Sequence, residues 1–261
     1  ERALGKAARL GILSVDDAEV LRPAARLYLD LTQILRLCLP GPLDPRTASA
    51  ELLAAEGIAC SAAAVGRAEA AARPALSRHL TGARSTETTD AFEFYVRCTL
   101  ELLPGDADRD GVAPRLVAAV RATGTRRLWS RVLPGVPEAL AALRAAGLRL
   151  VVVSNADGTV AEGLAAAGLA SCLDAVIDST VVGVEKPDPR IFAHALAAVG
   201  ARPEHALHVG DLYAIDVVGA RAAGLAAVLL DPYGDWVGAD CERTPDLPAL
   251  ARRVLEPGWR P

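Results

Sequence analysis

The second half of the chain alternates short apolar runs with longer segments of helical periodicity. The apolar runs have strand length and occupy residues 148–153, 175–177, 206–209 and 226–230. The segments between them carry apolar residues every three or four positions and occupy residues 136–146, 159–167, 189–199 and 214–223. Strands and helices that alternate in this way form right-handed βαβ units. The pattern therefore predicts an α/β fold, a parallel sheet with helices on both faces.

The first half follows a different pattern. One short apolar run, residues 26–29, ends at Asp30. The Ala-rich stretch that follows shows only helical periodicity, broken by Gly and Pro turn signals, and predicts helices at 47–56, 61–80, 86–103 and 112–128. We expect three parts: a helical extension (1–22), a Rossmann-like three-layer core (23–39 and 132–261) and an inserted all-α cap (40–131).

Composition narrows the class of protein. Apolar residues make up 52% of the 261 residues but aromatic ones only 4%, so Ala, Leu and Val must form the core. A net charge of −4 gives no basic surface for nucleic acid. The chain contains no apolar run of membrane-spanning length and no signal-peptide pattern, and its five cysteines are scattered. We expect a cytoplasmic protein with reduced thiols that binds no membrane; a monomer and a homodimer both remain open.

Polar residues follow the predicted strands at the points where those strands end. They are Asp30, Ser154 with Asn155, Lys186 in a loop before a helix, Asp211, and Asp216 five residues later. Each alone could be a helix cap, a turn residue or a solvated charge. Ligands of a doubly wound sheet, however, sit at the carboxyl ends of its strands, where all of these residues would converge.

This set of side chains suits phosphoryl transfer. A carboxylate can attack phosphorus only if its repulsion from the anionic substrate is relieved, and Mg2+ bound by Asp30 and Asp211 would do so. The Lys186 ammonium would neutralise further charge, while the Ser154 hydroxyl and the Asn155 backbone N–H would bind phosphate oxygens. Asp216 would orient Lys186 or a metal-bound water.

These motifs resemble the four motifs of the haloacid dehalogenase superfamily. The matching segments are Asp30, Ser154-Asn155, Lys186-Pro187-Asp188 and Gly210-Asp211 with Asp216. The resemblance implies a Rossmann-like core with a helical cap after the first motif, a magnesium ion and an aspartyl-phosphate on Asp30. It makes Asp211 and the Thr32 carbonyl further metal ligands, and Ser154 and Lys186 phosphate binders. We also expect Asp216 among the metal-binding residues. The expected substrate is a small phosphorylated metabolite.

The first motif departs from the family pattern. Thr32 stands where phosphatases of the superfamily carry a second Asp, the acid/base that protonates the leaving group. Loss of a positioned acid/base costs roughly 10²–10⁴-fold in rate. We therefore expect Thr32 to be a catalytic position of reduced power. Three outcomes stay open: a slow phosphatase, a hydrolase for substrates with good leaving groups, or a pseudoenzyme.

Two other functions and one other registration stay open. A metal-free dehalogenase would use Asp30 against carbon and would not need the second Asp, although the carboxylate of Asp211 would oppose an anionic haloacid. A catalytically weak binding or regulatory protein of the same fold is the other possibility. Residues 12–17 also place apolar positions before carboxylates, but this segment fits a helix better.

Overall fold

The computed structural model describes residues 51–81, 86, 88–103, 109, 111–123, 132–256 and 259. The helical extension predicted for 1–22 and the strand predicted for 26–29 lie outside these residues. So do Asp30 and Thr32, whose expected roles stay predictions. The predicted domain boundaries at 22, 39 and 131 stay predictions as well.

The described residues from 51 to 123, here called the helical unit, contain helices and no strand. After a helical stretch at 51–55 come α4 (Ala62–His79), α5 (Thr89–Leu102) and α6 (Val112–Thr123). Polar caps begin two of them: the Ser61 hydroxyl accepts the Ala64 N–H at 3.1 Å, and that of Thr88 accepts the Ala91 N–H at 3.2 Å. The helices bury one shared apolar cluster, which includes Ile58, Val65, Leu100, Val112 and Leu116.

The C-terminal part alternates strands and helices as the sequence predicts. Its strands are β1 (Val151–Ser154), β2 (Ala175–Asp178), β3 (Leu207–Gly210), β4 (Ala226–Leu230) and β5 (Glu242–Thr244). Its helices are α7 (Val136–Ala145), α8 (Val160–Ala166), α9 (Ser179–Val182), α10 (Pro189–Val199), α11 (Val218–Ala222) and α12 (Leu247–Val254). A π-helical turn, η4 (Tyr213–Val217), leads into α11. Short 3-10 turns occupy η2 (Ala170–Cys172) and η3 (Pro203–His205).

All paired strands of the described residues run parallel, which agrees with the predicted α/β class. β1 pairs with β2, and Ser154 lies opposite Asp178 at the carboxyl ends of the two strands. β3 pairs with β4, and β4 with β5. Where the sequence predicts one sheet, the described strands form two groups, β1-β2 and β3-β4-β5. The strand β5 was not predicted because its residues, Glu-Arg-Thr, form no apolar run.

Helices on the strands complete the core. α10 buries Ile191 and Phe192 completely, in a cluster that also holds Ile177 of β2 and Ala220 of α11. α7 and α8 form a second cluster around Val152 of β1. These contacts fix the loops at the carboxyl ends of the strands, where the polar residues lie.

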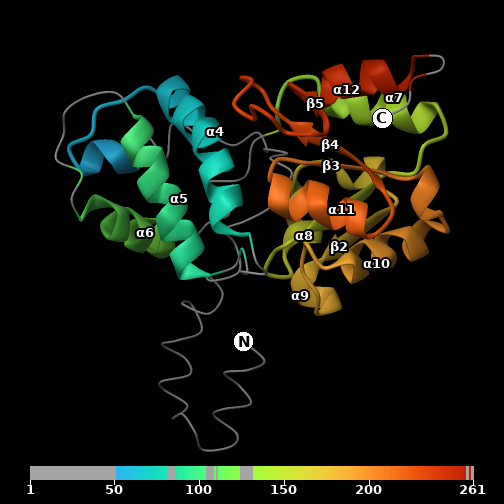
Figure 1. The fold of residues 1–261 in the computed structure, drawn as a ribbon, viewed down its shortest axis with the longest axis horizontal. Helices are drawn as coiled ribbons and strands as arrows, with labels where there is room; N and C mark the ends of the chain where they lie inside the picture. The colour runs from blue at the N-terminus through green and yellow to red at the C-terminus, as the bar shows by residue number, and fades with distance from the viewer. Residues whose placement is uncertain are drawn as a thin grey trace, which may run out of the picture.

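The helical unit packs on the α/β part through α4 (Figure 1). Leu76 and Leu80 form a buried cluster with Leu212 and Ile215, which lie just after β3. The Ser77 hydroxyl accepts the backbone N–H of Ala214 at 2.8 Å. One face of α4 therefore lies directly over the loop that follows β3.

Among the described residues, no helix is long and apolar enough to span a membrane. The four cysteines in this part of the chain are free thiols.

Candidate functional site

The candidate site lies around Asp216, a carboxylate that the structure buries completely. Its Oδ1 accepts a hydrogen bond from Lys186 Nζ at 2.7 Å and lies 3.2 Å from His208 Nε2. Its Oδ2 accepts the backbone N–H groups of Asp211 at 3.0 Å and of Leu212 at 2.9 Å. Asp216 thus ties the lysine to the backbone that carries Asp211, and the orienting role predicted for it has a visible basis.

The charges in this cluster depend on one another. Burial by itself raises the pKa of Asp216, but the Lys186 ammonium and the hydrogen bond from His208 outweigh it and hold that pKa well below its ordinary value. Burial lowers the pKa of His208. At neutral pH the cluster therefore contains an ion pair, Lys186 with Asp216, beside an uncharged imidazole.

Gly210, the last residue of β3, makes room for this carboxylate. A Cβ at Gly210 would lie 2.1 Å from Cγ of Asp216, far inside van der Waals contact. The close approach of backbone and carboxylate explains in physical terms why a glycine ends this strand.

Asn155 connects the end of β1 to the lysine loop through its side chain. Its Oδ1 accepts the Lys186 backbone N–H at 2.7 Å, and its Nδ2 donates to the Lys186 carbonyl and to the Thr86 hydroxyl, both at 2.9 Å. Sequence reasoning missed this bridging role, since it assigned Asn155 to substrate through its backbone N–H. That assignment stays a prediction, as does phosphate binding by the neighbouring Ser154, which is fully buried.

Arg73 of α4 is a site residue that sequence reasoning missed, as it missed His208 and Thr86. Its Nε lies 3.1 Å from Oδ2 of Asp211, and its side chain is only 10% exposed. Arg73 shares a helix face with Leu76, Ser77 and Leu80, at the i+3, i+4 and i+7 positions. An arginine in the apolar stripe of the helix predicted for 61–80 was the signal that could have identified it.

At the end of β3, the carboxylate placed to bind a hard cation such as Mg2+ is that of Asp211. Asp211 is partly exposed and already faces a positive group. Both oxygens of Asp216 are engaged, so direct coordination by Asp216 would require breaking one of its hydrogen bonds. Within the described part of the chain, no three metal-ligating side chains cluster. Asp211 thus fits the expected ion, and further ligands would have to come from elsewhere.

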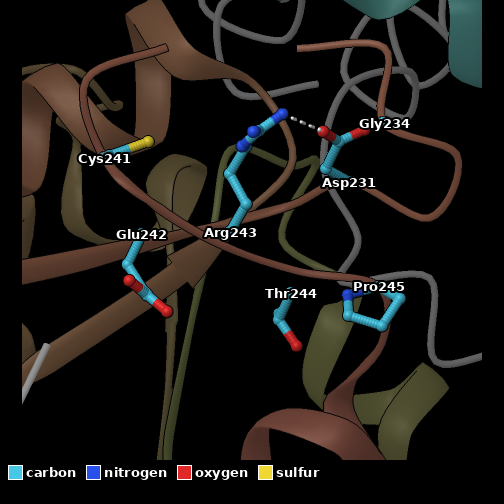
Figure 2. Close-up of a pocket in the computed structure, with 7 residues that line it drawn as sticks. All are labelled: Asp231, Gly234, Cys241, Glu242, Arg243, Thr244 and Pro245. Atoms are coloured by element: carbon cyan, nitrogen blue, oxygen red, sulfur yellow. Dashed lines mark hydrogen bonds and ion pairs between the residues drawn. The ribbon is translucent and has the colours of Figure 1, made fainter. Parts of the chain in front are cut away.

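An open hollow of about 440 Å³ lies at the ends of β4 and β5, lined by Asp231, Gly234, Cys241, Glu242, Arg243, Thr244 and Pro245. Figure 2 shows Arg243 directed at Asp231, whose carboxylate it contacts at 3.0 Å. None of the predicted site residues that the structure describes lines this hollow. Among its described lining residues the one cation, Arg243, is already paired with Asp231, so the hollow is a poor phosphate site.

The sequence matches a family model described as haloacid dehalogenase-like hydrolase over residues 43–224. This range includes Ser154, Lys186, Asp211 and Asp216. It begins after Asp30 and Thr32.

Curated relatives match parts of the chain. A human haloacid dehalogenase-like hydrolase domain-containing protein 3 is 38% identical over 128 residues, 49% of this chain and 51% of that protein. A phosphoserine phosphatase of Thermus thermophilus is 44% identical over 121 residues, 45% of this chain and 48% of the phosphatase. The chain spans about half the length of these relatives.

A different kind of relative matches a shorter stretch. A bifunctional glutamine synthetase adenylyltransferase/adenylyl-removing enzyme of Rhodopseudomonas palustris is 65% identical over 51 residues, which are 20% of this chain and 5% of that enzyme. About a fifth of the chain is thus similar to part of a protein whose name describes other chemistry.

Among solved structures, the HAD-hydrolase YfnB of Bacillus subtilis, crystallised bound to magnesium, superposes with a TM-score of 0.55 at 16% identity. The superposition covers 81% of this chain and 92% of that one, and it supports the α/β fold. The family model covers well over half of the residues, including the whole cluster around Asp216. The chain belongs to the haloacid dehalogenase-like hydrolase family.

Proposed function

We propose that this chain is a magnesium-dependent phosphohydrolase that acts on a small phosphorylated metabolite. The observation that carries the proposal is the cluster in which Asp216 holds both Lys186, at 2.7 Å, and the backbone of Asp211, at 3.0 Å. It joins an ammonium group and a carboxylate at the end of β3. Similarity to a phosphoserine phosphatase supports a phosphate ester as substrate.

In this proposal each residue has one task. Lys186 binds a phosphate oxygen through its ammonium, and the hydrogen bond to Asp216 orients that ammonium. Asn155 fixes the backbone of Lys186. The Ser154 hydroxyl at the end of β1 donates to a second phosphate oxygen. Asp211 would hold a magnesium ion, which supplies positive charge that offsets the repulsion between substrate and nucleophile.

Asp30 is the proposed nucleophile. Its carboxylate oxygen attacks phosphorus, the bond from phosphorus to the leaving oxygen breaks, and water later hydrolyses the aspartyl-phosphate. The Thr32 hydroxyl is a poor proton donor for the leaving oxygen at neutral pH, so turnover should be slow or restricted to good leaving groups. The family match begins after Asp30, so this role needs a test of its own.

The test is phosphate release from a panel of phosphorylated metabolites, with Mg2+ or with EDTA. Wild type should release phosphate only with Mg2+, and Lys186→Met and Asp211→Asn should reduce kcat/KM by at least about 10²-fold. Asp30→Asn should abolish turnover. If Asp30→Asn retains wild-type rates while Asp211→Asn does not, another group is the nucleophile; if no substrate turns over, the proposal fails.

A second candidate, a metal-free dehalogenase, gains support from Arg73. A bare carboxylate at Asp211 would repel an anionic haloacid, but the guanidinium at 3.1 Å balances that charge without a metal. Halide release from 2-haloacids in EDTA separates the two candidates. Halide release that EDTA leaves unchanged favours the dehalogenase. If no halide is released, the phosphohydrolase remains the favoured candidate.

A further inference from the structure

Arg73 and Asp211 form a cation–carboxylate contact at the position where the family places a metal ligand. The Nε to Oδ2 distance is 3.1 Å, and the two side chains are 10% and 23% exposed. A divalent cation bound by Asp211 would use the same carboxylate group, whose Oδ2 already contacts Arg73. Two positive groups cannot share one carboxylate at this range without strong mutual repulsion.

Neighbouring contacts on α4 hold Arg73 in this position. Leu76, one turn after Arg73 on the helix, packs against Leu212 and Ile215. The Ser77 hydroxyl accepts the Ala214 N–H at 2.8 Å. The guanidinium therefore reaches Asp211 from a docked helix, and its contact is part of how α4 sits on the loop after β3.

We propose that Arg73 is a resident counter-cation of Asp211, which a divalent cation must displace in order to bind. The inference rests on the proposed function, because it concerns the same site. It adds an antagonism between two events: cation binding at Asp211 weakens the Arg73–Asp211 contact, and that contact weakens cation binding. By thermodynamic linkage the two effects are equal in size.

The test is isothermal titration of Mg2+ into the full chain at fixed ionic strength. Arg73→Gln should bind Mg2+ on the order of 10-fold more tightly than wild type, within the 5- to 150-fold range of typical site coupling. Arg73→Lys, which keeps the charge, should stay near wild type. Asp211→Asn should lose the tight binding seen in the Gln variant.

Arg67→Gln is the matched control. Arg67 lies on the same helix and pairs with Asp235 of the α/β part at 2.6 Å, so its loss removes the same charge and also breaks a contact between the two parts. Its effect on Mg2+ affinity should be less than about 2-fold, because Arg67 does not contact Asp211.

Three results would overturn the inference. The first is equal Mg2+ affinity in wild type and Arg73→Gln, and the second is a gain in Mg2+ affinity in Arg67→Gln as large as that in Arg73→Gln. The third is no Mg2+ binding in either Arg73→Gln or Arg67→Gln. Melting curves with and without Mg2+ give a second reading, since the ion should stabilise Arg73→Gln more than wild type. Failure of the proposed function looks different. In that case Mg2+ binds and Arg73 modulates it, but no phosphate ester turns over.

Discussion

Replacing Asp216 with Asn should strongly destabilise the fold. Lys186 is 2% exposed at its side chain and Asp216 is 1% exposed, so the substitution leaves a buried ammonium without its counter-charge. Breaking a buried pair by removing one partner costs about 3–5 kcal/mol. In a domain of this size each kcal/mol lowers the melting temperature by about 2–4 °C, so the melting temperature should fall by roughly 6–20 °C.

Urea denaturation at pH 7 without Mg2+ measures this loss as a lower midpoint at an unchanged m value. Asp188→Asn is the control. Asp188 pairs with the exposed Arg190 at 2.6 Å and caps α10, a role that Asn also fills. The Asp188→Asn substitution should therefore lower the free energy of unfolding by less than about 1 kcal/mol.

The double variant Lys186→Met with Asp216→Asn tests the cause. If the stranded charge is the problem, removing the ammonium should recover part of the stability that Asp216→Asn loses. The reasoning is refuted if Asp216→Asn costs no more than Asp188→Asn, or if the two single losses simply add in the double variant.

Gly219→Ala should lower the free energy of unfolding by about 1–3 kcal/mol, because the new Cβ would lie 2.9 Å from Cα of Pro187. Gly163→Ala in α8 places its Cβ in open space and should raise the free energy of unfolding by about 0.4–1 kcal/mol. Thermal melts that rank the two variants alike would contradict this. Asp178→Asn should flatten the acid pH dependence of stability. Burial raises the pKa of Asp178, so the folded protein holds this proton more tightly than the unfolded chain does. Wild type therefore loses stability as pH rises from about 3.9 through the raised pKa. Urea midpoints of wild type and variant from pH 3.5 to 7 should diverge over that window, and parallel curves would rule out the effect.

Periodicity was enough to predict most of the described α/β elements. The runs at 175–177 and 226–230 became β2 and β4 within one residue, because buried parallel strands need continuous apolar residues. β1 begins at Val151, three residues later than the apolar run that predicts it. The short helices α9 and α12 were missed because four and eight residues carry little periodic signal.

Side-chain partners were harder to predict than elements. The position of Asp216 after the Gly-Asp pair suggested an orienting role, and its hydrogen bond to Lys186 has that geometry. The bridge from Asn155 to Thr86 joins residues 69 positions apart, and local pattern carries no information about it. The contact of Arg73 with Asp211 likewise depends on how α4 docks, which the sequence of one helix does not specify.

These contacts make the helical unit part of the site. Asp216 fixes Lys186 and the backbone of Asp211, but it leaves the Asp211 carboxylate to other partners. Arg73 supplies that partner from α4, and Thr86 reaches Asn155 from the segment between α4 and α5. A shift of α4 would therefore alter the charge at Asp211 while the buried pair beneath it stays intact. Substitution of Arg73 should consequently affect cation binding far more than it affects the stability of the α/β part.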